Sequence, residues 1–143
     1  MRAVELADAA LAYTTANTRG SGVEVIQADA TDATTLAEWN GTVDLIVTNP
    51  PYVPETPNLD PEVYHDPHDA VFAGEDGMGV ITGLIPTFAR LLRPGGKVAI
   101  EHDDSTSEAV QAVMARHGGF ERISALQDMT GTPRFVTAVR AVD

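Results

Sequence analysis

The sequence predicts an α/β fold built on a largely parallel sheet. Short apolar segments rich in β-branched residues alternate along the chain with segments of helical composition. The strongest apolar segment, residues 43–48, has side chains suited to a buried strand of a parallel sheet. A hydrophobic share of 43% with few aromatic residues is typical of this class, and 143 residues are enough for a single domain with a core.

The first half of the chain is expected to form alternating strands and helices. Residues 2–6 predict the end of a strand, and an Ala-rich helix is expected over 8–17. A strand over 23–27 and a short helix over 32–39, opened by an acidic or Thr cap, are expected before the strand over 43–48.

The second half begins with residues 50–76, which are rich in Pro and Asp and show no periodicity. A loop this long within a compact domain is usually functional. The expected elements that follow are an amphipathic helix over 76–92, a turn over 93–96, a strand over 97–102, a helix over 105–117, and strands over 120–126 and 134–142. Pro86 predicts a kink or break in the first of these helices. The last two strands flank Thr130-Gly-Thr-Pro133 and are expected to pair as a hairpin, so the carboxy-terminal strand is antiparallel. There is no repeat or linker, and residues 1–143 are interpreted as one domain.

Charge and composition exclude several classes of partner. The formal net charge is −12, from 21 acidic residues against 9 Lys and Arg that do not cluster. This surface repels phosphate backbones, so stable binding to nucleic acid is not expected. There is no cysteine to form disulfides or thiolate metal sites, and no apolar run is long enough to cross a bilayer. A cytoplasmic protein with a protein or small-molecule substrate is expected.

The segment with the clearest chemistry is Asn49-Pro50-Pro51-Tyr52, directly after the strand over 43–48. Open α/β sheets bind their ligands at this end of their strands. The two prolines remove backbone donors and leave carbonyl acceptors, the Asn amide can accept and donate, and the Tyr ring can stack on a planar group. Acceptors aimed at a planar NH₂ group can orient its lone pair towards an electrophile without a strong base. The motif therefore predicts a site for a planar nitrogen.

The chain resembles a known family in four segments. Asp44-Leu-Ile-Val-Thr-Asn-Pro-Pro-Tyr52 is similar to the signature of Rossmann-like amino-group methyltransferases. Three further segments resemble the HemK/PrmC family in particular: residues 65–78, Leu91-Leu-Arg-Pro-Gly-Gly-Lys-Val-Ala-Ile-Glu-His102 and Gln127-Asp-Met-Thr-Gly-Thr-Pro-Arg-Phe-Val136. That family methylates the glutamine of the Gly-Gly-Gln motif in peptide chain release factors. The resemblance implies S-adenosyl-L-methionine as the cofactor, a release factor as the protein substrate, and Asn49, Pro50, Pro51 and Tyr52 as the catalytic motif.

The resemblance also implies a set of cofactor contacts. Glu5, at the end of the first strand, would hold the ribose hydroxyls, and Asp29-Ala30 would border the adenine. Asn49 would touch both the substrate amide and the reactive end of the cofactor. Simpler roles remain open for the two acids: Glu5 can complement a helix start, and Asp29 can cap the helix expected near Asp32.

The resemblance covers the carboxy-terminal part of the family's catalytic domain. The family's first strand, its Gly-rich loop of the form Asp-x-Gly-x-Gly-x-Gly and its first helix would precede Met1. In the family that strand lies between those ending at Glu5 and Asn49. Either these two strands pair directly here, or the sheet stays open with edges that favour self-association. A natural truncation, a misassigned start and a fragment are all compatible with the sequence.

Other interpretations carry less weight. His65, Asp66, His68 and Asp69 lie close together in sequence, but no second ligand cluster accompanies them, so no metal site is expected. Glu101 and His102 could form an acid/base pair, although the proposed chemistry requires no general base. A nucleic-acid adenine methyltransferase shares the Asn-Pro-Pro-Tyr motif, and an inactive remnant of a methyltransferase is a third possibility.

Overall fold

The computed structural model describes residues 1–51 and 78–142. The elements in chain order are β1 (Arg2–Glu5), α1 (Asp8–Asn17), β2 (Glu24–Gln27), the 3₁₀ helix η1 (Ala37–Trp39), β3 (Val43–Thr48), α3 (Gly79–Leu91), β4 (Leu92–Glu101), α4 (Ser107–His117), β5 (Phe120–Gln127) and β6 (Pro133–Arg140). No helix within the described ranges is both long and apolar enough to cross a membrane.

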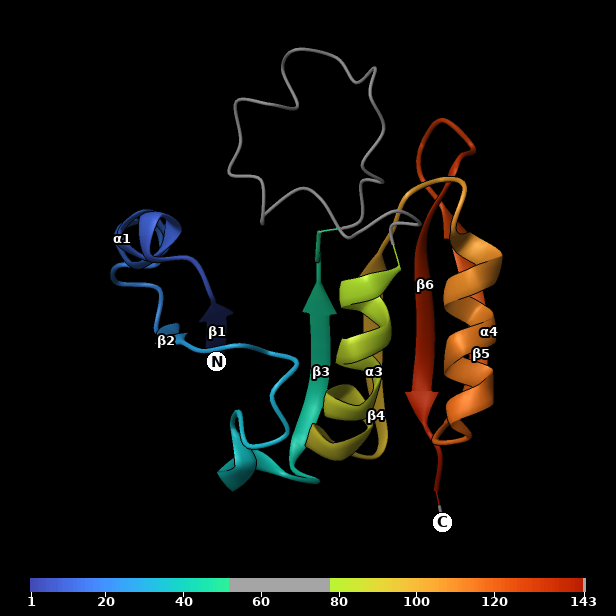
Figure 1. Ribbon diagram of the computed structural model, residues 1–143, viewed down its shortest axis with the longest axis horizontal. Helices are drawn as coiled ribbons and strands as arrows, with labels where there is room; N and C mark the ends of the chain where they lie inside the picture. Colours follow the sequence, from blue (N-terminus) through green and yellow to red (C-terminus); the bar gives the residue numbers. More distant parts are fainter. Residues whose placement is uncertain (52–77, 143) are drawn as a thin grey trace.

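The strands form two sheets (Figure 1). β1 and β2 make a two-stranded parallel sheet, and the other four strands form a sheet in the order β3-β4-β6-β5. β3 and β4 are parallel, whereas β6 is antiparallel to both β4 and β5. The predicted α/β class, the hairpin of the last two strands and the antiparallel carboxy-terminal strand are confirmed.

Among the described residues no strand lies between β1 and β3, and the two do not pair. The sequence left two alternatives, direct pairing of these strands or an open sheet. Direct pairing is wrong, and the sheet stays open. The arrows of β1 and β3 point the same way in Figure 1, so both strands end at the same edge of the structure.

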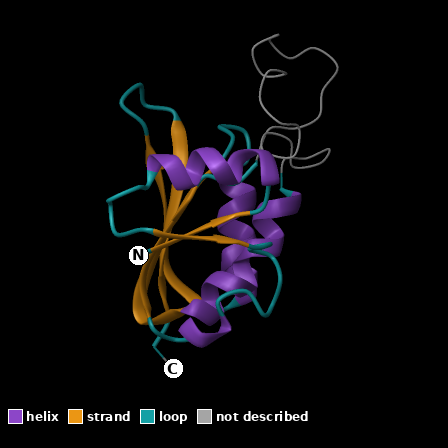
Figure 2. Cartoon of the chain, turned by 90° about the vertical axis from the view of Figure 1, so that its left-hand side faces the viewer, coloured by secondary structure: helices purple, strands orange, loops and turns teal. Residues whose placement is uncertain are grey.

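The core lies between one face of the four-stranded sheet and the helices α3 and α4. Figure 2 shows these helices gathered beside the strands. The register brings Ile46 beside Val98 and Ile100 beside Val136, and all four contribute to the core with Ile81, Ile85 and Met114 from the helices. This contact stabilises the larger sheet, because each buried aliphatic side chain contributes about 1.5–3 kcal/mol.

The opposite face of β3 is uncovered in the described structure. Leu45 is 58% exposed and Val47 is 71% exposed, although both were expected to be buried. The prediction that this strand is buried on both faces is therefore wrong. Alternate residues of a strand point to opposite faces, and α3 and α4 cover only the face that carries Ile46.

Two local predictions need correction. In place of the short helix over 32–39 the chain forms only η1, because the Asp32 carboxylate binds the N–H and hydroxyl of Thr34 and Leu36 adopts a left-handed backbone with φ of 55°. Residues 93–96, expected as a turn, lie within β4, where the register to β3 shifts and Gly95 has φ of 78°. Pro86 lies inside α3, which continues through it.

Candidate active site

The predicted site residues follow the carboxyl ends of three parallel strands. Glu5 is the last residue of β1, Asp29 follows β2, and Asn49 follows β3. β1 and β2 are in register up to Glu5 and Gln27, and the N–H of Ala28 donates to the Glu5 carbonyl over 3.1 Å. The structure thus puts the sequence-predicted acids on adjacent strands, at the edge where open α/β sheets bind ligands.

The Glu5 side chain is partly buried, and one of its oxygens is engaged locally. Its Oε1 accepts a hydrogen bond from the N–H of Ala7, which is the N-cap residue of α1, over 2.9 Å. The carboxylate therefore satisfies one of the backbone donors at this helix start, which is the simpler of the two roles considered for Glu5.

Asp29 is exposed and organises the turn after β2. Its Oδ1 accepts hydrogen bonds from the N–H of Thr31 over 2.8 Å and from the Thr31 hydroxyl over 2.7 Å. Ala30 packs against the core, and a Cβ on Gly83 of α3 would lie 3.2 Å from the Thr31 methyl group. The small residue at 83 therefore lets this turn approach α3 closely. Asp29 orders its own turn and does not cap a helix at Asp32.

Asn49 and the prolines lie where β3 ends. Asn49 is exposed, Pro50 is buried and Pro51 is partly buried. Within residues 1–51 and 78–142 the Asn49 side chain makes no hydrogen bond, so its amide is available to a ligand. Tyr52, the fourth residue of the motif, lies outside the described residues, as do the four candidate metal ligands between His65 and Asp69. Across the described parts of the chain no cluster of His, Asp and Glu could hold a metal ion.

His102 at the end of β4 is fully buried. Its Nδ1 lies 2.7 Å from the carbonyl oxygen of Asp103, so this nitrogen donates, and its Nε2 has no hydrogen-bond partner among the described residues. A ring buried in this way has no access to solvent, which favours the structural role of His102 over acid/base catalysis.

The sequence did not predict the network at the β5–β6 turn. The Asp128 carboxylate accepts from the N–H and hydroxyl of Thr130, from the N–H of Thr132, and from Nε of Arg134 over 3.3 Å. The Thr130 hydroxyl and these other donors lower the pKa of Asp128 to about 2. Asp128 and Arg134, which belong to the segment over 127–136 that resembles the family, therefore help to close the β5–β6 hairpin.

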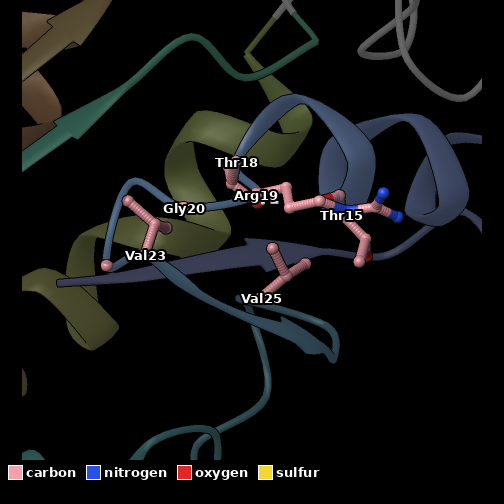
Figure 3. Close-up of a pocket in the computed structure, with 7 residues that line it drawn as sticks. Thr15, Thr18, Arg19, Gly20, Val23 and Val25 are labelled. Atoms are coloured by element: carbon pink, nitrogen blue, oxygen red, sulfur yellow. Dashed lines mark hydrogen bonds between the residues drawn. The ribbon is translucent and has the colours of Figure 1, made fainter.

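Two open cavities lie away from the carboxyl ends of the strands. One, of about 410 Å³, is lined by side chains from the end of α1 and the start of β2, among them Thr15, Arg19 and Val23 (Figure 3). It lies at the amino end of β2, opposite Asp29. The other, of about 370 Å³, is lined by Met1, Trp39 and the chain from Thr42 to Leu45, so it separates the start of β1 from β3.

Comparison with known proteins gives the family. No family model matches the chain. The release factor glutamine methyltransferase of Corynebacterium glutamicum is 59% identical over 116 residues, which are 81% of this chain and 42% of that protein. The enzyme of the same name from Mycolicibacterium smegmatis is 51% identical over 139 residues, which are 96% of this chain and 50% of that protein. The chain belongs to the release factor glutamine methyltransferase family.

Other similar proteins extend the family comparison. A 4-amino-L-phenylalanine/4-methylamino-L-phenylalanine methyltransferase of Streptomyces pristinaespiralis is 43% identical over 123 residues, covering 85% of this chain and 41% of that protein. A methyltransferase from Pyrococcus furiosus has the same fold, with a TM-score of 0.69, 18% identity and coverage of 99% of this chain and 62% of the other. The release-factor-specific glutamine methyltransferase of Alicyclobacillus acidocaldarius has a TM-score of 0.52 at 23% identity, covering 99% and 79%.

The Rossmann-like methyltransferase fold is confirmed by these structures, and the motif-based resemblance is confirmed by the family's sequences. The chain spans between 42% and 50% of the length of the first two relatives.

Proposed function

We propose that these residues form the substrate-positioning part of an S-adenosyl-L-methionine-dependent methyltransferase that modifies the side-chain amide nitrogen of a release factor glutamine. The observation that carries the proposal is the position of Asn49. Its amide is exposed at the carboxyl end of β3, next to two residues that have no backbone N–H. The proposal is supported by relatives of this name at 59% and 51% identity.

The chemistry required of Asn49 is orientation. The carboxamide oxygen of Asn49 can accept one N–H of a glutamine amide, and a proline carbonyl can accept the other. With both hydrogens held, the nitrogen lone pair, which is otherwise delocalised into the carbonyl, can be directed at an electrophilic carbon. The nitrogen would form one bond to the methyl carbon as the bond from that carbon to the sulfonium sulfur breaks and its electron pair passes to the sulfur, and the nitrogen would then lose one proton to water. Tyr52 is proposed to stack on the planar substrate amide.

The described residues fit a nucleoside cofactor. Glu5 and Asp29 carry carboxylates at the ends of adjacent parallel strands. Oε1 of Glu5 accepts from the N–H of Ala7, and Oδ1 of Asp29 accepts from the N–H and hydroxyl of Thr31. We assign Glu5 to the ribose hydroxyls, Asp29 and Ala30 to the adenine, and Asn49 to the reactive end. S-adenosyl-L-methionine, when bound, supplies the electrophilic methyl group.

The proposed partner is a peptide chain release factor in the cytoplasm. The net charge of −12 disfavours a phosphate-rich substrate and is compatible with a protein that presents a glutamine. No stable complex with nucleic acid is proposed.

A chimera tests the proposal. These 143 residues would replace the 139 matched residues of the M. smegmatis relative, and the chimera would be incubated with S-adenosyl-L-methionine and a release factor that carries Gly-Gly-Gln. We expect one added methyl group, mapped by mass spectrometry to that glutamine. Methyl transfer to DNA and none to the release factor would refute the proposal.

A second candidate substrate is a small aromatic amine. It is favoured by the 43% identity to a methyltransferase named for 4-amino-L-phenylalanine. An arylamine nitrogen, like an amide nitrogen, is planar and shares its lone pair with a π system, so Asn49 could orient either. Adding 4-amino-L-phenylalanine to the same assay distinguishes the two candidate substrates. The preferred substrate is the one that, at low concentration, inhibits methylation of the other.

A further inference from the structure

We propose that Asn40-Gly41 is a site of spontaneous deamidation and that Arg90 of α3 suppresses this reaction in the folded chain. The modified group is the side-chain amide of Asn40, and the co-reactant is water. The site precedes the amino end of β3, whereas Asn49 lies at the carboxyl end of that strand. The inference therefore does not depend on the methyl-transfer proposal.

The first observation is the composition and exposure of this turn. Of the asparagines in the sequence, Asn40 alone is followed by glycine. The backbone nitrogen of a residue without a Cβ can approach the preceding side chain with little hindrance. Asn40 and Gly41 are both exposed, and a Cβ on Gly41 would meet no atom within 4 Å. Water therefore has access to this peptide bond.

The reaction has two balanced steps. The Gly41 nitrogen loses its proton to hydroxide and bonds to Cγ of Asn40, while the bond from Cγ to the amide nitrogen breaks and that nitrogen takes up a proton and leaves as ammonia. The product is a cyclic succinimide. Water then adds to one of the two ring carbonyl carbons, whose bond to the ring nitrogen breaks, and the nitrogen regains a proton. Opening at Cγ gives aspartate, and opening at the main-chain carbonyl gives isoaspartate.

The second observation is that Arg90 fixes the reacting side chain. Oδ1 of Asn40 accepts a hydrogen bond from Nη1 of Arg90, whose Nη2 donates to the Thr35 carbonyl over 2.7 Å. Arg90 is partly buried near the end of α3, so these contacts hold the guanidinium and the Asn40 amide in one orientation. A donor on Oδ1 by itself makes Cγ more electrophilic, so the protection depends on the orientation that the contact imposes.

The third observation is that the attacking nitrogen is engaged. The Gly41 N–H donates to the Arg90 carbonyl over 2.9 Å, and the Thr42 N–H donates to the Leu91 carbonyl over 3.1 Å. A peptide nitrogen attacks only after it loses its proton, which the first of these hydrogen bonds opposes. The ψ angle of Asn40 is 126°, and this bond must rotate to bring the nitrogen beside Cγ. Local opening of the turn therefore precedes the reaction, and the rate follows the population of the open form.

The two products would affect the structure differently. Isoaspartate adds one methylene to the main chain before Gly41 and would displace the N–H groups of Gly41 and Thr42 from the last carbonyls of α3. Aspartate leaves the main chain unchanged and offers Arg90 a carboxylate in place of the amide oxygen. The isoaspartate product is therefore the one that loosens the start of β3.

The experiment incubates this chain and a synthetic peptide of residues 36–44 in mildly alkaline buffer. Peptide mapping by mass spectrometry follows the conversion of Asn40, with Asn17, which precedes threonine, as the internal reference. We expect Asn40 to convert roughly tenfold more slowly in the folded chain than in the peptide, and at the rate of the peptide in guanidinium chloride. Equal rates in the folded chain and the peptide, or faster conversion at Asn17 than at Asn40 in guanidinium chloride, would each overturn the proposal.

Variants at Arg90 sharpen the test. Arg90→Ala should raise the rate of Asn40 conversion in the folded chain roughly tenfold, because it removes the charged donor that fixes the amide. Arg90→Lys keeps the charge but not the planar fork and should give an intermediate rate, which tests the role of Arg90 even if the alanine variant does not fold. Arg93→Ala is the matched control, because Arg93 binds Asp44 over 2.6 Å and the Pro94 carbonyl, and it should leave the rate unchanged. Equal rates in the Arg90 and Arg93 variants would overturn the assignment of the protection to Arg90.

Discussion

The guanidinium carbon of Arg2 lies 4.3 Å from the centroid of the Trp39 ring. Arg2 belongs to β1 and Trp39 to η1, which leads into β3, so the contact joins the small sheet to the segment preceding the larger one. Arg2 also pairs with Glu24 of β2 at 2.8 Å and with Glu38. These carboxylates raise the pKa of Arg2, Glu24 more than Glu38, and the guanidinium stays charged.

Arg2→Ala is expected to loosen the small sheet. The substitution removes the cation–π contact with Trp39 and the ion pairs with Glu24 and Glu38, so hydrogen exchange at Val4 and Ile26 should accelerate roughly tenfold. Arg2→Lys should recover only part of this protection, because an ammonium group lacks the planar stacking surface of the guanidinium. Arg19→Ala, in the turn after α1, is the control, and an equal effect there would contradict a specific role for Arg2.

Asp128 is expected to make stability depend on pH in the acid range. Its pKa is about 2 in the folded chain against an ordinary 3.8, so its contribution is present above pH 4 and is lost as the pH falls towards 2. Asp128→Asn should lower the melting temperature at pH 7, and its difference from the unsubstituted chain should shrink through that window. An NMR titration of the carboxyl group in Thr130→Ala should show a higher pKa, because one donor is removed. A difference in melting temperature that does not change between pH 4 and pH 2 would contradict this account.

Gly96→Ala is expected to disturb the junction of β3 and β4. A Cβ at this position would lie 2.9 Å from the carbonyl oxygens of both Val43 and Arg93, and backbone atoms cannot move aside as a flexible side chain can. We expect the free energy of unfolding to fall by about 1–3 kcal/mol, as in other overpacked sites. Chemical denaturation measures this directly, and an unchanged midpoint would show that the strands accommodate the methyl group.

Asn49→Ala in the chimera is expected to lower kcat/KM for the release factor by roughly 10²–10³-fold, because positioning and charge stabilisation by one polar group are of this size. Asn49 is exposed, so the melting temperature should stay nearly constant. Asn17→Ala, at the exposed end of α1, is the matched control and should retain full turnover. Near-normal turnover of the Asn49 variant would remove this residue from the mechanism.

Local elements were predictable wherever short-range preferences act alone. The helix over 8–17 and the strand over 43–48 have the bounds expected from composition and periodicity. The helix predicted over 32–39 was wrong because the helical tendency of this segment competes with hydrogen bonds that the Asp32 carboxylate accepts from Thr34. The turn expected over 93–96 was wrong because pairing with β3 draws these residues into β4. The positions of Glu5, Asp29 and Asn49 at strand ends were also predictable, because each residue lies at or just after the carboxyl end of a strand expected from the sequence.

The sequence by itself determined the α/β class, the family and the candidate site, since each depends on residues that are near neighbours along the chain. Only the tertiary structure decided that β1 and β3 do not pair with each other, that Leu45 and Val47 are exposed, and that His102 is buried. These outcomes depend on which distant segments lie against each strand. The apolar composition of a strand favours burial, but the strand becomes buried only where another strand or helix packs against it. In this structure α3 and α4 cover only one face of β3.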